Sequence, residues 1–517
     1  MATRRPFDLD RLTIDAVREG AFRDRPVTVL GFARSGIALA RFLADAGAVV
    51  TVYDGRPPDE LAEALAQLDG RRIRLLAGRD VDARASWEDA ALVATSPSIN
   101  PDYPTTEPRL RAALRALVAR RRGGDPFAPA LVSEPDLFLR LCPAPTVGVT
   151  GTKGKTTTAS LIAAVLGADR AHPVALGGNI GTPLVEQLAE LTPEHRVVIE
   201  LSELQLPTLS RGTTVAVYTN VTSDHLDRHG TLAAYRAAKR RLAELVDPDG
   251  ALVLNADDPV VAAYADLGTA PAVRYRQGRP SPGGVGVEDG WIVDGGVARL
   301  PLAGARGVAT EPAARIMPVA ELSIPGRHNV SNTLAAVATG LLFGVAPDAI
   351  RRAATAFEGV EHRLEPVAVV DGVRFVNDSQ GTQPDAVVAA LRAFDPPIVL
   401  IAGGRDKDID LSALGPVVAE RAVAAVLIGE SGPALETIFR AAGLARTERA
   451  ATLDDAVRRA DAIAREHLAA GGPQPATVLL SPAAASFDMF ADYAARGRAF
   501  KTAVAGLAGE RRERRSR

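Results

Sequence analysis

The stretch from residue 147 to residue 158 reads Val-Gly-Val-Thr-Gly-Thr-Lys-Gly-Lys-Thr-Thr-Thr, which predicts a strand, a glycine loop and the start of a helix. Glycines let backbone N–H groups approach an anion, and a helix N-terminus adds partial positive charge. Lys155 supplies a charge for terminal phosphates, and the Thr156 hydroxyl suits a phosphate-bound Mg2+. The stretch therefore predicts a nucleoside triphosphate site, and its expected contacts are Gly151, Thr152, Lys153, Gly154, Lys155, Thr156 and Thr157.

Two later strands are predicted to end in polar residues near this loop. Glu200 follows the apolar run Val197 to Ile199, where an acid can bind a metal opposite a phosphate loop; the alternative is a solvated surface acid. A polar cluster after the strand from Val215 contains His225, a candidate metal ligand or catalytic group. On the next predicted helix, the spacing of Lys239 alone is typical of an exposed lysine.

An Ala-rich helix is predicted after the sequence Gly326-Arg-His-Asn-Val-Ser-Asn. Asn329 or Ser331 is expected to cap this helix. Three amide and imidazole side chains in five positions exceed what a cap requires, so a turn that contacts a purine base is the second interpretation. The Gly- and Pro-rich residues 276–315 predict short strands or a loose loop without a chemical signature.

The first third of the chain opens with strand, glycine turn, helix and strand, from Pro26 to Asp54, the pattern of a Rossmann-like nucleotide-binding unit. The fingerprint is incomplete, because Ala33 stands where the middle glycine would approach a pyrophosphate. Three interpretations stay open: a dehydrogenase-type cofactor site, a nucleotide-sugar pocket and a purely structural turn.

The last third alternates strands with helices, and each strand ends in a polar loop. Asp371-Gly372 predicts a hairpin, and the strand after it runs into residues 377–382, Asn-Asp-Ser-Gln-Gly-Thr. Later strands end before Lys407 and before Ser486. This alternation predicts a second Rossmann-like domain with a site at the C-terminal edge of its sheet.

Composition limits the class of protein. A chain of 517 residues fits roughly three domains, and 47% hydrophobic residues suffice for packed cores. Sixty Lys and Arg nearly balance 62 Asp and Glu, so no charge excess indicates nucleic acid or an anionic membrane as a partner. The single cysteine, Cys142, excludes an internal disulfide framework and a multi-cysteine metal site. Without a signal-peptide core or a spanning apolar run, we expect a cytoplasmic protein that does not insert into membranes.

Nine motifs resemble, in order and over nearly the full length, those of the Mur ligase family of ATP-dependent amide-forming ligases. They read Gly-Thr-Lys-Gly-Lys-Thr-Thr, Gly-Gly-Asn-Ile-Gly, Glu-Leu-Ser-Glu-Leu-Gln-Leu, Asp-His-Leu-Asp-Arg, Tyr-Arg-Ala-Ala-Lys, Gly-Arg-His-Asn-Val-Ser-Asn, His-Arg-Leu-Glu, Asn-Asp-Ser and Ser-Pro-Ala-Ala-Ala-Ser-Phe-Asp. The resemblance implies an α/β fold of three domains. These are a Rossmann-like domain for a UDP-linked substrate (1–128), a central P-loop ATPase-type domain (129–356) and a C-terminal Rossmann-like domain for an amino acid (357–517).

The resemblance also implies roles for individual residues. Lys155 and Thr156 would bind ATP phosphates and Mg2+, with Glu200 as a metal ligand. His225 and Lys239 would hold a second Mg2+, the lysine as its CO2-derived carbamate, since a carbamate replaces a repelling ammonium with an anionic oxygen donor. The implied nucleotide contacts are Asn329, Arg363 and Asp378. The implied substrate contacts are Ser35, Asp54 and Arg56 around the uridine, and Asn179, Thr382, Lys407, Ser486 and Tyr493.

The implied reaction converts an alanyl carboxylate into an acyl phosphate at the expense of ATP, and an amine then displaces the phosphate. The resemblance is to members that add D-glutamate to UDP-N-acetylmuramoyl-L-alanine in cytoplasmic peptidoglycan precursor synthesis. We therefore expect small-molecule substrates, no nucleic acid partner, and a monomer whose domains close around ATP.

One loop departs from the family's pattern. Where the family usually continues Asn-Asp-Ser with Lys-Ala-Thr-Asn, this chain has Gln380-Gly-Thr-Gln383. The lost cation predicts either compensation by a neighbouring Arg or Lys, or another acceptor amino acid, such as L-glutamate. A folylpolyglutamate-synthase-like ligase and a nucleotide-sensing switch also stay open as interpretations of the chain, and the uridine-type first domain argues against the former.

Overall fold

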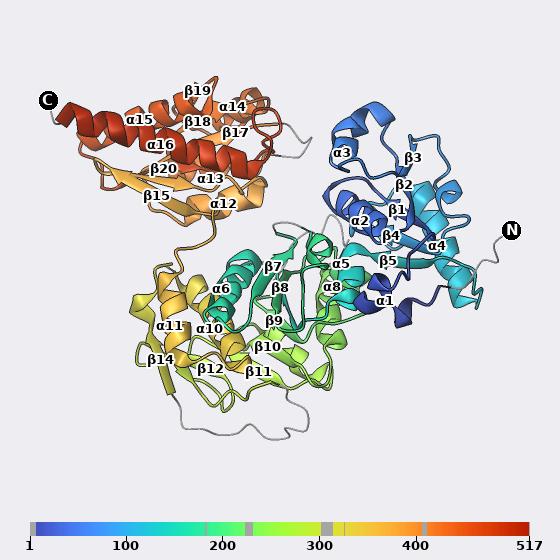
Figure 1. Ribbon diagram of the computed structural model, residues 1–517. Coiled ribbons are helices and arrows are strands. Elements are labelled where there is room, and N and C mark those ends of the chain that lie inside the picture. The colour runs from blue at the N-terminus through green and yellow to red at the C-terminus, as the bar shows by residue number, and fades with distance from the viewer. Residues whose placement is uncertain are drawn as a thin grey trace. The chain divides into compact units, whose positions relative to one another are not determined.

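The computed structural model describes residues 7–180, 183–222, 231–300, 314–324, 326–405 and 411–515. The chain divides into two compact units, Met1–Phe357 and Glu358–Arg517. Within the described residues the strands form three sheets, of five, nine and six strands, each flanked by helices (Figure 1). The first two sheets belong to the first unit and the third sheet to the second unit. The predicted α/β fold is confirmed, whereas the residue boundaries proposed for its three domains stay a prediction.

The first sheet has the strand order β3-β2-β1-β4-β5, and all its neighbouring pairs are parallel. Its strands are β1 (Pro26–Leu30), β2 (Val49–Asp54), β3 (Arg74–Ala77), β4 (Leu92–Thr95) and β5 (Ala130–Ser133). Its helices are α1 (Ile14–Arg18), α2 (Arg34–Asp45), α3 (Ala62–Ala66), α4 (Pro108–Arg122) and α5 (Glu134–Leu141). Because the chain continues to opposite sides of β1, the glycine turn after β1 lies at a switch point, where open α/β sheets bind ligands.

The second sheet has the order β14-β13-β12-β11-β10-β9-β6-β8-β7. Its strands are β6 (Thr146–Thr150), β7 (Val174–Gly178), β8 (Arg196–Glu200), β9 (Val215–Tyr218), β10 (Ala251–Asn255), β11 (Ala272–Tyr275), β12 (Val285–Glu288), β13 (Trp291–Asp294) and β14 (Ala314–Pro318). Strands β6 to β12 pair in parallel, and β12, β13 and β14 pair antiparallel. The short strands predicted within 276–315 are confirmed by β12 and β13, and residues 301–313 lie outside the described residues. Since β6 lies between β8 and β9, the predicted phosphate loop lies between the ends of both strands.

Helices cover both faces of the second sheet. They are α6 (Lys155–Gly167), α8 (Leu232–Leu245), α9 (Pro259–Ala262), α10 (Arg327–Leu342) and α11 (Pro347–Ala356). Leu161 and Val165 of α6 pack with Leu334 of α10 in one buried cluster. A separate cluster contains Tyr235 and Leu242 of α8. Each fully buried Leu or Val contributes about 2 kcal/mol, so these two layers hold the loop's flanking elements in place.

The third sheet has the order β15-β16-β20-β17-β18-β19. Its strands are β15 (Glu365–Val370), β16 (Val373–Asn377), β17 (Ile398–Gly403), β18 (Ala422–Ile428), β19 (Thr447–Arg449) and β20 (Ala476–Leu480), and its helices are α12 (Pro384–Arg392), α13 (Leu414–Arg421), α14 (Gly432–Ala441), α15 (Leu453–Ala469) and α16 (Tyr493–Arg515). Strands β15 and β16 are antiparallel, and the other pairs are parallel. The predicted hairpin is confirmed, because Asp371 and Gly372 have φ of 52° and 82°, as a tight hairpin turn requires.

Short 3-10 turns complete the described elements. They are η1 (Leu9–Arg11), η2 (Pro58–Leu61), η3 (Ala83–Ser86), η4 (Leu184–Gln187), η5 (Leu206–Thr208), η6 (Ala263–Asp266) and η7 (Val319–Glu321). In the part of the chain that the structure describes, no helix combines the length and the apolar character needed to cross a membrane.

Candidate active site

The loop between β6 and α6 has the backbone geometry of an anion site. Gly151 and Gly154 have φ of 150° and 82°, a region that favours glycine. Gly154 is the N-cap of α6, and no side chain caps this helix. The first N–H groups of α6 are therefore available to donate to an anion. Lys155 Nζ donates to the Thr152 carbonyl at 2.9 Å, which holds the lysine charge over the loop.

The residues after β9 hold the loop in shape. The Asn220 side chain accepts from Lys153 N–H and donates to Lys153 O, both at 2.9 Å, and Thr219 Oγ1 donates to the same carbonyl at 2.7 Å. A Cβ on Gly151 would collide with Thr219 Oγ1, so the loop accepts only glycine there. The sequence interpretation missed Thr219 and Asn220, although their position directly after a buried strand was the available signal.

Glu200 lies opposite the loop in a chain of hydrogen bonds. Thr156 Oγ1 donates to Glu200 Oε2 at 2.8 Å, and Asn179 Nδ2 donates to Glu200 Oε1 at 2.9 Å. Glu200 is only 2% exposed, so the interpretation of a solvated surface acid is wrong. The structure therefore brings together the predicted residues Thr156, Glu200 and Asn179.

Lys239 lies beneath the loop and is fully buried. Its Nζ donates to the Gly151 carbonyl at 2.8 Å and to Thr150 Oγ1 at 3.3 Å. The expectation of an exposed helix lysine, drawn from spacing alone, is wrong, because α8 turns this face toward β6. Tyr235 lies one turn earlier on α8, with its hydroxyl 2.9 Å from Thr152 Oγ1. That contact engages the Thr152 side chain with α8, a role that the sequence did not indicate.

Two candidates lie outside the described residues: His225, in 223–230, and Lys407, in 406–410. Among the described residues, no group of three or more His, Cys, Asp or Glu side chains could hold a metal ion. The described part of the candidate metal set therefore consists of Thr156, Glu200 and Lys239.

Helix α10 contacts helix α6 through Asn332, and Asn329 accepts a hydrogen bond from Asn332. Asn332 Oδ1 accepts from Thr158 Oγ1 at 3.1 Å, and Asn332 Nδ2 donates to Asn329 Oδ1 at 3.1 Å. Since α10 begins at Arg327 with Gly326 as its N-cap, the predicted caps Asn329 and Ser331 are wrong; both lie inside the first turns. Asn332 belongs to the quoted motif, but its contact with α6 depends on helix packing.

In the first sheet, Asp54 and Arg56 form a closed pair under the glycine turn. Asp54 accepts from Phe32 N–H at 2.7 Å, from Arg56 N–H at 2.9 Å, and from Arg56 Nε and Nη2 at 3.0 and 2.9 Å. Burial raises the pKa of Asp54, but the hydrogen bonds from Arg56 and Phe32 outweigh it and leave the pKa below its ordinary value. A carboxylate this engaged is poorly suited to accept both ribose hydroxyls of a dinucleotide, which weakens the dehydrogenase interpretation.

The glycine turn after β1 also contacts the segment that contains Asn179, the hydrogen-bond partner of Glu200. Arg34 begins α2 and its Nη2 donates to the Asn179 carbonyl at 3.4 Å. Ser35, the next residue of α2, is half-buried. The turn of the first sheet and the Asn179 segment of the second therefore lie next to one another within the first unit.

In the second unit, Asp378 follows β16 at the carboxyl edge of the third sheet. Ser481 Oγ donates to its Oδ2 at 2.7 Å, and Leu364 N–H donates to its Oδ1 at 3.2 Å. Burial raises the pKa of Asp378 to about 6, although the nearby Arg363 charge lowers it. The structure thus places the predicted residues Arg363 and Asp378 together.

The raised pKa of Asp378 predicts a pH-dependent stability. An unfolded Asp releases its proton near its ordinary pKa of 3.8, whereas folded Asp378 keeps the proton up to about pH 6. Stability contributed at this site therefore falls as pH rises between these values, by up to about 3 kcal/mol, and is constant above them. Urea unfolding followed by circular dichroism should show this fall in the native protein relative to Asp378→Asn, and parallel curves would contradict it.

A buried arginine organises the predicted amino-acid loops. Arg496 is 1% exposed; its Nε donates to Ser379 Oγ at 3.0 Å, and its Nη groups donate to the carbonyls of Ser379, Ala484 and Ala485 at 2.9–3.2 Å. Burial lowers its pKa to about 10. Ser379 Oγ also donates to the Tyr493 carbonyl at 2.7 Å, and Ser486 directly follows Ala485. The sequence interpretation did not select Arg496, because one arginine at the start of a helix carries no local signal.

Gln380 occupies the position where the family pattern has lysine. Its N–H donates to the His362 carbonyl at 3.0 Å, and its carbonyl accepts from Thr382 N–H at 2.8 Å. Its side-chain Oε1 is buried without a hydrogen-bond partner among the described residues. An unsatisfied buried acceptor costs about 1–3 kcal/mol, so a donor supplied by a ligand would be stabilised here.

Comparison with known proteins gives a consistent result. The family model for the Mur ligase middle domain matches residues 149–340, and the model for the Mur ligase glutamate ligase domain matches residues 362–484. A protein of Symbiobacterium thermophilum, named UDP-N-acetylmuramoylalanine--D-glutamate ligase, is 40% identical over 93% of this chain and 97% of its own. A protein of the same name from Roseiflexus sp. is 39% identical over 92% of this chain and 97% of its own.

Solved structures match the fold at lower identity. The UDP-N-acetylmuramate-alanine ligase MurC of Thermotoga maritima gives a TM-score of 0.51 at 19% identity, over 93% of this chain and 99% of that one. MurF of Acinetobacter baumannii gives a TM-score of 0.50 at 18% identity, over 89% and 91%. Both support the same α/β architecture.

Proposed function

This chain belongs to the Mur ligase family, and from that premise we propose that it is an ATP-dependent ligase that adds D-glutamate to UDP-N-acetylmuramoyl-L-alanine. The observation that carries this proposal is the 40% identity over 93% of the chain to a relative named for that reaction. The product is a peptidoglycan precursor. Because the reaction consumes ATP, we place it in the cytoplasm, and we expect the enzyme to act as a monomer.

The residues around the loop fit ATP with Mg2+. Thr156 Oγ1 uses its proton toward Glu200, which leaves oxygen lone pairs on both side chains for a hard cation. When bound, Mg2+ would supply Lewis-acid stabilisation of charge on the transferring phosphoryl group. Asn179 would keep Glu200 oriented through its hydrogen bond to Oε1.

We further propose that Lys239 carries a CO2-derived carbamate and contributes to a second Mg2+ site. The Lys239 side chain is fully buried beneath the loop, and carbamate formation by CO2 takes place on the neutral amine of a lysine. A carbamate keeps one N–H, which suffices for the 2.8 Å hydrogen bond to the Gly151 carbonyl. We assign His225 to the same site by its motif alone.

The chain's own residues account for the proposed chemistry. A carboxylate is a poor electrophile until its oxygen becomes a leaving group, and transfer of the γ-phosphoryl group from ATP to the alanyl carboxylate provides that group. The N–H groups of α6 and the Lys155 ammonium would stabilise the phosphoryl charge as it moves. The amine of the amino acid then attacks the acyl phosphate, and phosphate leaves. Asp54 and Arg56 would orient the uridine end; Lys407, Ser486 and Tyr493 would hold the amino acid.

An acceptor assay tests the proposed reaction. With ATP, Mg2+ and UDP-N-acetylmuramoyl-L-alanine, we expect stoichiometric release of ADP and formation of the amide product only when D-glutamate is added. Mass spectrometry of the UDP-linked product measures the outcome. Each substrate is omitted in turn as a control, and L-glutamate is the matched stereochemical control. Equal turnover of L-glutamate would reject the named acceptor and keep the ligase class.

Gln380 supports a second candidate, a Mur-type ligase with another acceptor amino acid. Its Oε1, which has no partner among the described residues, accepts hydrogen bonds, and the amide is uncharged, whereas the lysine of the family pattern donates hydrogen bonds and carries charge. A carboxylate would be held less tightly beside an amide oxygen than beside an ammonium. The acceptor assay, repeated with a panel of L- and D-amino acids, decides between the two candidates.

A further inference from the structure

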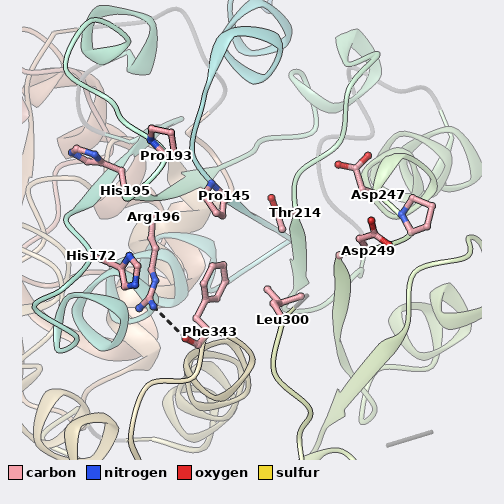
Figure 2. A pocket seen from close by; sticks show the side chains of 12 residues that line it. Pro145, His172, Pro193, His195, Arg196, Thr214, Asp247, Asp249, Leu300 and Phe343 are labelled. Atoms are coloured by element: carbon pink, nitrogen blue, oxygen red, sulfur yellow. Dashed lines mark hydrogen bonds between the residues drawn. The ribbon is translucent and has the colours of Figure 1, made fainter. Parts of the chain in front are cut away.

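A cavity of about 590 Å3 lies in the first unit, away from the candidate active site (Figure 2). Its lining includes Pro145 before β6, Arg196 at the start of β8, Thr214 before β9 and Gly250 before β10. The phosphate loop and Glu200 follow the opposite ends of these parallel strands. Since a five-residue strand spans roughly 15 Å, the cavity is separate from the ATP site.

Arg196 contributes an underused donor to one side of this cavity. Its side chain is 7% exposed; Nη2 donates to Asp169 Oδ2 at 2.9 Å and to the Phe343 carbonyl at 3.2 Å. Its Nη1 has no hydrogen-bond partner within the described part of the chain. A buried donor without a partner costs about 1–3 kcal/mol, so an acceptor on a ligand would recover this free energy.

Two histidines, His172 and His195, lie on the same side of the cavity, and their hydrogen bonds determine which ring nitrogen carries the proton. His172 Nδ1 lies 2.8 Å from the Glu194 carbonyl, which can only accept, so Nδ1 carries the proton. His195 Nδ1 accepts from Thr192 N–H at 3.2 Å, so a neutral His195 carries its proton on Nε2. His195 Nε2–H is therefore a second donor in the lining of this cavity.

The opposite side is acidic, and the surface between is apolar. Figure 2 shows Asp247 and Asp249 across the cavity from the two histidines, with Phe343 and Leu300 between them. Both aspartates are exposed, and neither has an ion-pair partner among the described residues. Since Asp169 already balances Arg196, the two aspartates leave the cavity with net negative charge.

We propose that this cavity is a second small-molecule site, for a zwitterion with an apolar body. The carboxylate lies against Arg196 and His195, the ammonium lies against Asp247 and Asp249, and the body packs on Phe343. The cavity has the size of typical ligand sites, about 300–1,000 Å3. A bare metal ion fits less well, because no group of three His, Cys, Asp or Glu side chains able to hold one occurs in the described residues.

Calorimetric titration of the full chain with 4-(aminomethyl)benzoate tests the proposal. The matched probes are 4-methylbenzoate, which lacks the ammonium, and benzylamine, which lacks the carboxylate. We expect the zwitterion to bind at least tenfold more tightly than either, because each of them lacks one of the two charged contacts; tenfold corresponds to about 1.4 kcal/mol. Equal affinity for all three probes, or no binding of the zwitterion, would overturn the proposal.

Two sets of surface substitutions locate the binding. Asp247→Asn with Asp249→Asn should weaken the zwitterion to the level of 4-methylbenzoate and leave 4-methylbenzoate unchanged. His195→Gln should weaken both carboxylate-bearing probes and leave benzylamine unchanged. Asp247 and Asp249 are exposed, whereas His195 is partly buried and accepts from Thr192 N–H, so thermal unfolding is measured for both variants to verify that they fold as the native protein does. Loss of binding in the presence of saturating ATP, or unchanged affinities in both variants, would contradict this location.

Discussion

Replacing Lys155 with alanine should lower kcat about 10³-fold, equivalent to about 4 kcal/mol of transition-state stabilisation. Lys155 Nζ lies over the loop through its 2.9 Å hydrogen bond to the Thr152 carbonyl. Its charge would act most on the phosphoryl group in transit, so we expect a larger effect on kcat than on KM for ATP. Steady-state release of ADP, measured with saturating amino acid, provides both constants.

Lys153→Ala is the matched control, because this lysine belongs to the same loop but is exposed. Its charge is screened by solvent, so its loss should cost no more than about tenfold in kcat. Thermal unfolding of both variants should match the native protein, since Lys155 makes only one hydrogen bond within its loop. A Lys155→Ala enzyme with near-normal kcat would reject the assignment of this loop to ATP.

Replacing Lys239 with methionine should also lower kcat by about 10³-fold, provided that the lysine functions as a carbamate. Methionine keeps the apolar stem of this buried side chain and removes the nitrogen that reacts with CO2. In buffer depleted of CO2, the native enzyme should lose activity and regain it when bicarbonate is added. The Lys239→Met variant should stay low at every bicarbonate concentration.

A spectroscopic readout separates chemistry from packing. With 13C-bicarbonate, the native protein should show a carbamate carbon resonance that Lys239→Met lacks. Because the substitution also removes the hydrogen bond to the Gly151 carbonyl, ATP binding is measured in parallel to detect a distorted loop. Full activity of Lys239→Met across bicarbonate concentrations would exclude the carbamate.

The local elements of the fold were predictable from the sequence because each has a short-range cause. The loop before α6 needs glycines at positive φ, and β6 begins at Thr146 as its β-branched run indicates. The hairpin at Asp371-Gly372 follows from turn chemistry alone. The family resemblance extended these elements to a full-length architecture, which the comparisons confirm.

The errors arose where packing decides the environment of a side chain. Lys239 looked like an exposed helix lysine, but α8 buries it under the loop. Asn329 looked like a helix cap, but α10 begins two residues earlier and continues through it. Both errors applied correct local preferences to positions whose surroundings come from distant segments.

The sequence by itself determined the fold class, the glycine loop before α6 and the family, because these depend on residue order within short segments. Only the tertiary structure decided which polar groups meet. Asn220 lies 67 residues from Lys153, Asn332 lies 174 residues from Thr158, and Arg496 lies 117 residues from Ser379. These contacts form because β9 lies beside β6, α10 packs on α6, and α16 packs against β16. Sheet order and helix packing, rather than spacing along the chain, thus determine the geometry of the site.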